Sequence, residues 1–186
     1  GADVVLVGRD QASLESTAAD IESLGRKAHP LVADMSDPAG CQDICQQVVA
    51  ELGPIDILIN NVGGRRENIP TEEMSLEKWR ELMDLNLTSA FVCMRVVGAA
   101  MIDRGGGGRI INISSINSMV AGRNIAGRHY ETAKGAMIQL TRSVAADWAQ
   151  HDITVNAICP GGFMTEPNQR WAREHPEVIE GFRSHI

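Results

Sequence analysis

Positive charge is in short supply in this sequence. Its 186 residues include 17 lysines and arginines against 24 aspartates and glutamates, which gives a formal net charge of −7 at pH 7. Binding to nucleic acid or to an anionic membrane surface depends on basic patches. We therefore expect no nucleic-acid partner and no membrane partner, and a small molecule as the ligand.

The sequence also shows few long runs of apolar residues. We expect no stretch to approach the roughly 18 apolar residues of a membrane helix, and the first residues carry no basic region followed by an apolar block. Hydrophobic residues still make up 44% of the chain. A chain of this length buries about 70% of its unfolded surface, so we expect one globular domain over residues 1–186.

Cysteine is limited to four residues, and their spacing suits neither a disulfide framework nor a metal site. Cys41 and Cys45 lie four residues apart in an apolar helical stripe, Cys93 lies in another apolar helix, and Cys159 follows a strand. We interpret all four as structural thiols, with no bound metal. Cysteines that serve as free structural thiols favour a reducing, cytoplasmic location for the protein.

Short apolar runs alternate with helical patterns along the whole chain. The expected strands cover residues 3–8, 31–33, 55–59, 109–114 and 153–158, and the expected helices cover 14–25, 38–53, 76–102 and 130–150. Repeated strand–helix–strand units predict an α/β fold with a doubly wound parallel sheet, Rossmann-like, in three α/β/α layers. Ligands bind such sheets at the carboxyl ends of the strands. Polar residues gather at those ends: Arg9, Asp34, Asn61, Ser114, Ser115 and the Pro160-Gly161 turn.

Tyr130 and Lys134 are the most informative pair in the chain. On a helix, residues four apart share a face, so the ammonium can lie near the phenol oxygen. A free tyrosine loses its proton only near pH ~10, and a neighbouring cation stabilises the phenolate. The pair therefore suits proton transfer, although the spacing alone also arises by chance in amphipathic helices.

Five motifs, in order, resemble the short-chain dehydrogenase/reductase superfamily over essentially the whole chain. They are Asn60-Asn61-Val62-Gly63, Asn86 in Asp84-Leu85-Asn86-Leu87, Asn112-Ile113-Ser114-Ser115, Tyr130 with Lys134, and Pro160-Gly161 with Thr165. The resemblance implies an NAD(P)-dependent oxidoreductase acting on a ketone or secondary alcohol. It implies Tyr130, Lys134, Ser115 and Asn86 as catalytic residues.

One family motif is missing. Members begin with a strand and a glycine-rich turn that holds the cofactor pyrophosphate, and this sequence has no such turn. Gly1-Ala2-Asp3-Val4-Val5 instead resembles the family's second strand. We expect a domain truncated at both ends, whose missing strand belongs at the centre of the sheet, and so a badly destabilised fold that does not bind the dinucleotide by itself.

The resemblance also assigns roles within the site. Tyr130 would exchange the proton with the substrate oxygen, and the Ser115 hydroxyl would hydrogen-bond that oxygen. Lys134 would stabilise the phenolate and bind the nicotinamide ribose, and Asn86 would hold a relay water. The alternative for Asn86 is a buried amide that caps a helix irregularity.

The identity of the catalytic serine stays open between two residues. Ser115 precedes Tyr130 by 15 residues and Ser118 precedes it by 12, and the family separation usually falls between these values. We favour Ser115 because it ends the matching strand. The extra residues then fall in the loop from 122 to 129.

The expected cofactor is NADP, with NAD as the alternative. An acidic residue after the second family strand selects NAD, but Gly8 stands there, and Arg9 can pair with a 2′-phosphate. By resemblance, the remaining cofactor contacts are Asp34 and Met35 at the adenine, Asn61, Val62 and Gly63 along the dinucleotide, Pro160 and Gly161 in the cofactor loop, and Phe163 and Thr165 at the carboxamide.

Charged and polar residues in the expected loops indicate the class of substrate. Arg65, Arg66, Arg123, Asn124, Arg128 and His129 are expected in loops that flank the site, which hints at a sugar acid or polyol, unless these charges are merely solvated. Trp171 and Phe182 belong either to a mobile lid or to a packed helix. The alternatives are a 3-oxoacyl-[acyl-carrier-protein] reductase and a non-catalytic cofactor sensor. By resemblance, the full-length protein forms a homo-oligomer, a dimer or tetramer, through the helices at 76–102 and 130–150.

Overall fold

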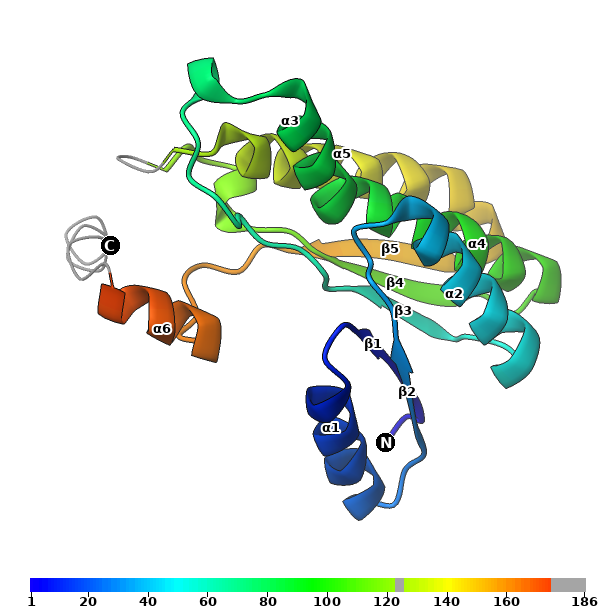
Figure 1. The fold of residues 1–186 in the computed structure, drawn as a ribbon. Helices are drawn as coiled ribbons and strands as arrows, with labels where there is room; N and C mark the ends of the chain where they lie inside the picture. Colours follow the sequence, from blue (N-terminus) through cyan, green and yellow to red (C-terminus); the bar gives the residue numbers. More distant parts are fainter. Residues whose placement is uncertain (123–125, 175–186) are drawn as a thin grey trace.

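The computed structural model describes residues 1–122 and 126–174 (Figure 1). The strands are β1 (Val4–Gly8), β2 (Ala28–Val32), β3 (Ile57–Asn60), β4 (Gly108–Ile113) and β5 (Ile153–Ile158). The α-helices are α1 (Gln11–Ser23), α2 (Pro38–Leu52), α3 (Leu76–Met83), α4 (Ser89–Arg104), α5 (Arg128–Trp148) and α6 (Glu166–Glu174). A π-helical segment, η2 (Asp84–Thr88), joins α3 to α4.

Side-chain caps fix where the helices begin. The Asp37 carboxylate accepts a hydrogen bond from the Ala39 N–H, and Pro38 occupies the first turn, where its missing N–H costs nothing. Ser75 caps α3 in the same way, by accepting from the Lys78 N–H. The predicted start of the helix at Pro38 is therefore confirmed.

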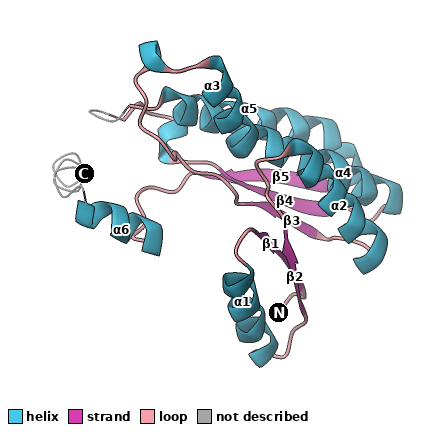
Figure 2. Ribbon diagram, viewed as in Figure 1, coloured by secondary structure: helices cyan, strands magenta, loops and turns pink. Residues whose placement is uncertain are grey.

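All strand pairs are parallel, as predicted, and the fold is α/β with helices flanking the sheets (Figure 2). The strands nevertheless form two separate sheets, β1-β2 and β3-β4-β5. In the part of the chain that the structure describes, one edge of β1 and one edge of β3 therefore carry no strand partner. The expectation that a further strand belongs at the centre of the family's sheet stays a prediction.

The second strand begins earlier than predicted. It covers Ala28–Val32 instead of 31–33, and Pro30 pairs in register with Leu6. Proline lacks the N–H that a central strand must donate, but β2 pairs with β1 alone, and an edge strand tolerates it. The proline explains why the sequence pattern missed the first half of the strand.

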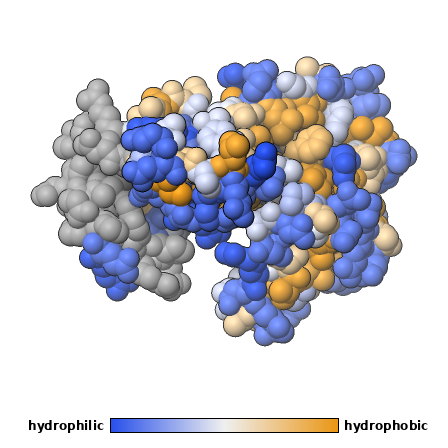
Figure 3. Space-filling view, turned by 45° about the horizontal axis from the view of Figure 1, so that its top comes forward, coloured by the Kyte–Doolittle hydropathy of each residue, from blue (hydrophilic) through white to orange (hydrophobic). Residues whose placement is uncertain are grey.

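The core lies between the three-stranded sheet and helices α2, α4 and α5. Ile110, at the centre of β4, is fully buried, and it packs with Cys93, Val97 and Met101 of α4. On the opposite face of this sheet, Ile57 and Ile59 remain exposed. Apolar patches also interrupt the hydrophilic surface in the space-filling view (Figure 3).

The helical run Leu76–Arg104 corrects the expectation that no stretch is apolar enough for a membrane span. Within the described residues, this run of 29 residues has a window with a mean hydropathy of 1.6, and 56% of that window is buried inside the fold. Burial of this kind is what a core helix shows, since α4 packs on α2 and on the sheet.

Three cysteines are buried, as structural thiols should be. Cys41, Cys45 and Cys93 are free thiols in the core between α2 and α4, and the Cys45 and Cys93 sulfurs lie 3.6 Å apart. Cys159 is a free, exposed thiol.

Candidate functional site

Lys134 is anchored to the end of β4 through two hydrogen bonds. Its Nζ donates to the Ile113 carbonyl at 2.7 Å, and the Ser114 hydroxyl donates to the Lys134 carbonyl at 2.9 Å. The side chain is buried, and this burial lowers the pKa of Lys134 from 10.5 to about 8. The ammonium is therefore held in place, and among the described residues the Ile113 carbonyl is its one hydrogen-bond acceptor.

Two cations lie near the Tyr130 ring. Both Tyr130 and Lys134 belong to α5, as predicted, and the Lys134 Nζ lies 5.9 Å from the ring centroid. The Arg65 guanidinium carbon lies 5.0 Å from the same centroid. The sequence spacing reveals the first of these cations and not the second.

Asn86 holds the loop after β3 in place. Its Oδ1 accepts from the Gly64 N–H at 2.8 Å, while its Nδ2 donates to the carbonyls of Gly64 at 3.0 Å and Leu82 at 2.8 Å. Asn86 is fully buried within the π-helical segment η2. These contacts match the alternative reading of Asn86 as a cap of a helix irregularity, and they add a clamp on Gly64. The relay water stays a prediction.

Gly63 lies where a side chain would not fit. A Cβ at this position would lie 2.8 Å from the Asn86 Oδ1 and 3.0 Å from the Lys134 Nζ. The Asn86 amide and the Lys134 ammonium therefore both lie next to the Gly63 Cα. Only glycine, which has no side chain, lets the main chain pass this close to the two groups. The structure thus brings together Gly63, Asn86, Lys134 and Tyr130.

The three serines near the end of β4 differ in how their hydroxyl hydrogens are used. Ser114 donates to Lys134, and Ser118 donates to the Ser115 carbonyl at 2.6 Å. Ser115 accepts from the Asn117 N–H at 3.2 Å. Among the described residues, Ser115 is therefore the one of the three whose hydroxyl hydrogen has no protein acceptor.

Arg9 and Asp34 face each other at the carboxyl ends of β1 and β2. The Arg9 Nη1 lies 3.9 Å from the Asp34 carboxylate, and both side chains are more than half exposed. Hydrogen bonds from Ser36, with a smaller contribution from the Arg9 charge, lower the pKa of Asp34. Since an exposed pair at this distance is weak, the guanidinium can turn to another anion.

Met35 departs from the expected cofactor contact. Its side chain is buried in the core, where the Cys41 thiol donates to the Met35 carbonyl at 3.1 Å. An adenine contact by this residue can therefore involve only its main chain.

The remaining predicted cofactor residues lie in open loops. Asn61 and Val62 follow β3, and the Pro160 carbonyl accepts from the Ile116 N–H at 2.9 Å, which ties the loop after β5 to the end of β4. A Cβ on Gly161 would meet no atom within 4 Å. Phe163 and Thr165 are exposed in the same loop.

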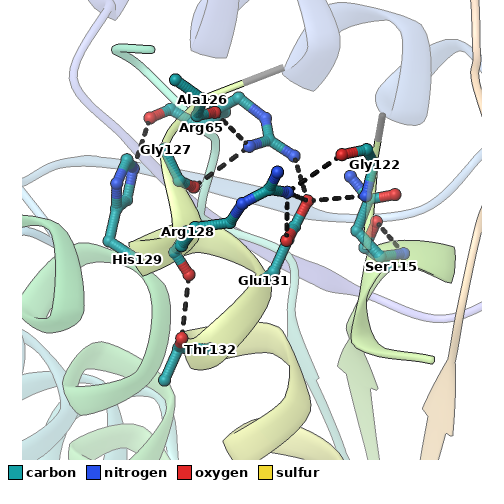
Figure 4. A network of polar contacts seen from close by, with 10 residues as sticks. Arg65, Ser115, Gly122, Ala126, Gly127, Arg128, His129, Glu131 and Thr132 are labelled. Carbon is teal, nitrogen blue, oxygen red and sulfur yellow. Dashed lines mark hydrogen bonds and ion pairs between the residues drawn. The ribbon is translucent and has the colours of Figure 1, made fainter. Parts of the chain in front are cut away.

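The expected substrate loop is partly helix, and most of its described charges are already paired (Figure 4). The helix α5 begins at Arg128, so Arg128 and His129 lie in its first turn and not in a loop, and His129 is buried. Arg66 is exposed, with a positive φ of 61°. Arg123, Asn124 and Phe182 lie outside the described residues, as does the side chain of Trp171, whose backbone belongs to α6.

Sequence reasoning missed Glu131, the residue directly after Tyr130. Its carboxylate, 11% exposed, accepts from Arg128 at 2.8 Å, from the Gly122 N–H at 3.0 Å and from Arg65 at 3.4 Å (Figure 4). The sequence signal that could have pointed to Glu131 is an acidic residue placed directly after Tyr130, in Tyr130-Glu131-Thr132-Ala133. No local sequence pattern predicts the contact of Glu131 with Arg65, which lies 66 residues away in the chain.

Residues 1–176 match the family described as short chain dehydrogenase. The chain belongs to this family. The match spans the segments that carry Tyr130, Lys134, Asn86 and the Gly63 turn.

Several family members resemble the chain closely. It is 41% identical over 170 residues to a gluconate 5-dehydrogenase of Gluconobacter oxydans, covering 91% of this chain and 65% of that protein. It is 34% identical over 160 residues to a galactitol 2-dehydrogenase of Rhizobium johnstonii, covering 86% and 62%. A solved gluconate 5-dehydrogenase of Burkholderia cenocepacia, in complex with NADP and tartrate, superposes with a TM-score of 0.80 at 35% identity, covering 91% and 65%. This chain thus spans less than two thirds of the length of each.

No group of three His, Cys, Asp or Glu side chains is placed to hold a metal ion within residues 1–122 and 126–174.

Proposed function

We propose that this short-chain dehydrogenase chain belongs to an NADP-dependent oxidoreductase that interconverts a secondary alcohol and a ketone on a sugar acid. The observation that carries the proposal is the convergence of the Tyr130–Lys134 pair with Asn86 on the Gly63 turn, beside the end of β4. Each of these groups suits one task in such a reaction.

The residues at this edge fit a nicotinamide dinucleotide. Gly63 leaves open the space that a Cβ would fill beside the Lys134 Nζ, so a ribose hydroxyl can approach that ammonium. When bound, the nicotinamide accepts or supplies the hydride. Arg9 and Asp34 would hold the adenosine end, Asn61, Val62 and the main chain of Met35 would line it, and Pro160, Gly161, Phe163 and Thr165 would flank the carboxamide.

Proton transfer falls to Tyr130. Negative charge develops on the substrate oxygen as a ketone is reduced, and a proton must reach that oxygen. The Tyr130 hydroxyl would supply the proton, with an effect of typically 10² to 10⁴ in rate, and would remove it in the oxidative direction. Lys134, fixed by the Ile113 carbonyl, stabilises the phenolate that remains.

Ser115 is the better candidate for the hydrogen bond to the substrate oxygen. The hydroxyl hydrogens of Ser114 and Ser118 are committed to backbone carbonyls, whereas Ser115 has no protein acceptor within the described part of the chain. A donor that is already positioned and uncommitted costs the least to recruit in the transition state.

The preference for NADP rests on Arg9. Its pairing with Asp34 at 3.9 Å is loose and exposed, so the guanidinium is available to a 2′-phosphate. The solved Burkholderia cenocepacia relative binds NADP. NAD remains the alternative cofactor.

A sugar acid is the favoured substrate and a polyol is the second choice. The relatives that support them are the gluconate 5-dehydrogenase and the galactitol 2-dehydrogenase. The test is a cofactor oxidation and reduction assay on the full-length protein with sugar acids, polyols, ketoses and 3-oxoacyl thioesters. Turnover of thioesters alone would favour the acyl-carrier-protein reductase, and cofactor binding without any turnover would favour a cofactor sensor.

We also propose a cytoplasmic homo-oligomer. The four free thiols suit a reducing compartment. A mainly apolar groove between α4 and α5 offers a surface for pairing two copies. It is lined by Phe91, Met94, Arg95, Ala99, Ile102, Val144 and Trp148. Light scattering of the full-length protein tests the oligomer, and a monomer at assay concentration would contradict it.

A further inference from the structure

Arg65 is fixed over the Tyr130 ring by contacts that do not involve a ligand. Its Nη1 donates to the carbonyls of Ala126 at 2.8 Å and Gly127 at 3.0 Å, and its Nη2 lies 3.4 Å from the Glu131 carboxylate. The side chain is 17% exposed. The guanidinium therefore has little freedom to leave the ring, whose centroid lies 5.0 Å away.

Glu131 supplies the opposing charge. Burial pushes the pKa of this carboxyl up, but the hydrogen bond from the Gly122 N–H and the charges of Arg128 and Arg65 outweigh that effect, and the net pKa is lowered. Glu131 therefore stays ionised at neutral pH. It follows Tyr130 directly in α5. Its carboxylate holds one end of the Arg65 guanidinium (Figure 4).

We propose that Arg65 and Glu131 form a positioning pair that sets how readily Tyr130 ionises, with Arg65 favouring the phenolate and Glu131 opposing it. The pair acts in addition to Lys134. A cation over an aromatic face is attracted to the ring electrons, and the attraction grows when the ring becomes a phenolate. The proposal rests on the function proposed above only in giving that ionisation a catalytic purpose.

The two charges make opposite predictions. Arg65→Gln removes the positive charge, so Tyr130 should ionise at a higher pH. Glu131→Gln removes the negative charge while Arg65 keeps its bonds to Ala126 and Gly127, so Tyr130 should ionise at a lower pH. A purely structural role would shift both variants in one direction or shift neither.

Other charges near α5 are shared by both variants. Lys134 lies beside the ring, Arg128 and His129 share the first turn of α5, and the segment 114–122 carries no charged residue. The segments α3 and η2, which also pack on α5, carry Glu77, Lys78, Arg80, Glu81 and Asp84. None of these residues is replaced in either variant, and the one of them that loses an ion pair is Arg128, in Glu131→Gln. Its freed positive charge would also favour the phenolate, so the Arg65→Gln variant, in which Arg128 keeps Glu131, is the measurement that isolates Arg65.

Tyr130 is the one tyrosine of the 186 residues, so its ionisation can be followed directly. We would titrate phenolate ultraviolet absorbance in the full-length protein and subtract a Tyr130→Phe background. We expect the midpoint to rise by about half a pH unit or more in Arg65→Gln and to fall by a similar amount in Glu131→Gln. Lys78→Gln is the matched control, because it also removes one positive charge. Lys78 forms ion pairs with Glu67, in the loop that carries Arg65, and with Glu81. The midpoint of the Tyr130 titration should not move in this variant.

Shifts in the same direction, or no shift in either variant, would overturn the proposal. If Arg65→Gln fails to fold, Glu131→Gln decides alone, and an unchanged or raised midpoint contradicts the pair. The pH profile of substrate oxidation, measured on the same variants, should follow the titration. Shifted titrations without turnover of any substrate would refute the proposed function and leave the pair standing.

Discussion

The Tyr130 hydroxyl is the atom on which the proposed chemistry depends most. Replacing Tyr130 by Phe removes the proton donor and leaves the ring, and with it the contacts to Arg65 and Lys134, in place. We expect turnover in the full-length protein to fall by about 10² to 10⁴ or more, with cofactor affinity nearly unchanged. Steady-state assays and a fluorescence titration of the cofactor test this, and retention of full activity would disprove the assignment.

Lys134 ties the stability of the fold to pH. Its pKa is about 8 in the folded state against 10.5 for the free side chain, because burial disfavours the ammonium. The unfolded state therefore binds more protons between pH 8 and 10.5, and the free energy of unfolding should rise with pH across that window. Below pH 8 the full penalty of burying the charge is present, at most about 3 kcal/mol.

The measurement for Lys134 is denaturant unfolding of the full-length protein, without cofactor, from pH 7 to 10.5. Lys134→Met keeps the buried stem and has no charge to release. The free energy of unfolding of the parent protein should increase relative to that of Lys134→Met as the pH rises above 8. A difference between the two proteins that stays constant over the whole range would argue against the buried ammonium.

At the scale of elements, the packing of α4 against α5 depends on Gly98. A Cβ at this position would overlap the Trp148 ring. Gly98→Ala should therefore destabilise the protein by about 1–3 kcal/mol, because a packed core absorbs an extra methyl group only by shifting. Thermal unfolding of the full-length protein tests this against Gly162→Ala, since a Cβ on Gly162 meets no atom within 4 Å. Equal stability of the two variants would count against this account of the contact.

Local patterns predict most elements because they act over a few residues. The cap at Asp37 with Pro38 predicts the start of α2, and the Tyr130–Lys134 spacing predicts that both residues lie on one helix. The pattern around Asn86 predicts one helix over 76–102 and leaves an irregularity at Asn86 only as an alternative, whereas the structure has the π-helical segment η2, in which Asn86 exchanges two hydrogen bonds with Gly64 of a distant loop. Contacts between segments are beyond the reach of local pattern.

The same limit applies to the candidate site. Tyr130, Lys134, Ser115 and Asn86 could be named from motifs, because a family fixes their order along the chain. Arg65 appeared in the sequence only as a loop charge, although it lies over the Tyr130 ring. Its role depends on three contacts with residues more than 60 positions away, and nothing in the local sequence encodes them.

For the molecule as a whole, the division of the strands into two sheets decides what the 186 residues can do alone. Parallel strands rely on neighbours on both edges, yet β1 and β3 each have an edge without a partner in the described residues, and Ile57 and Ile59 are exposed on the larger sheet. We expect these residues, expressed alone, to lack a cooperative unfolding transition and to show no binding of nicotinamide dinucleotide. Calorimetry and cofactor titration, with the full-length protein as the control, test this, and a sharp melt with micromolar binding would show that the two sheets suffice.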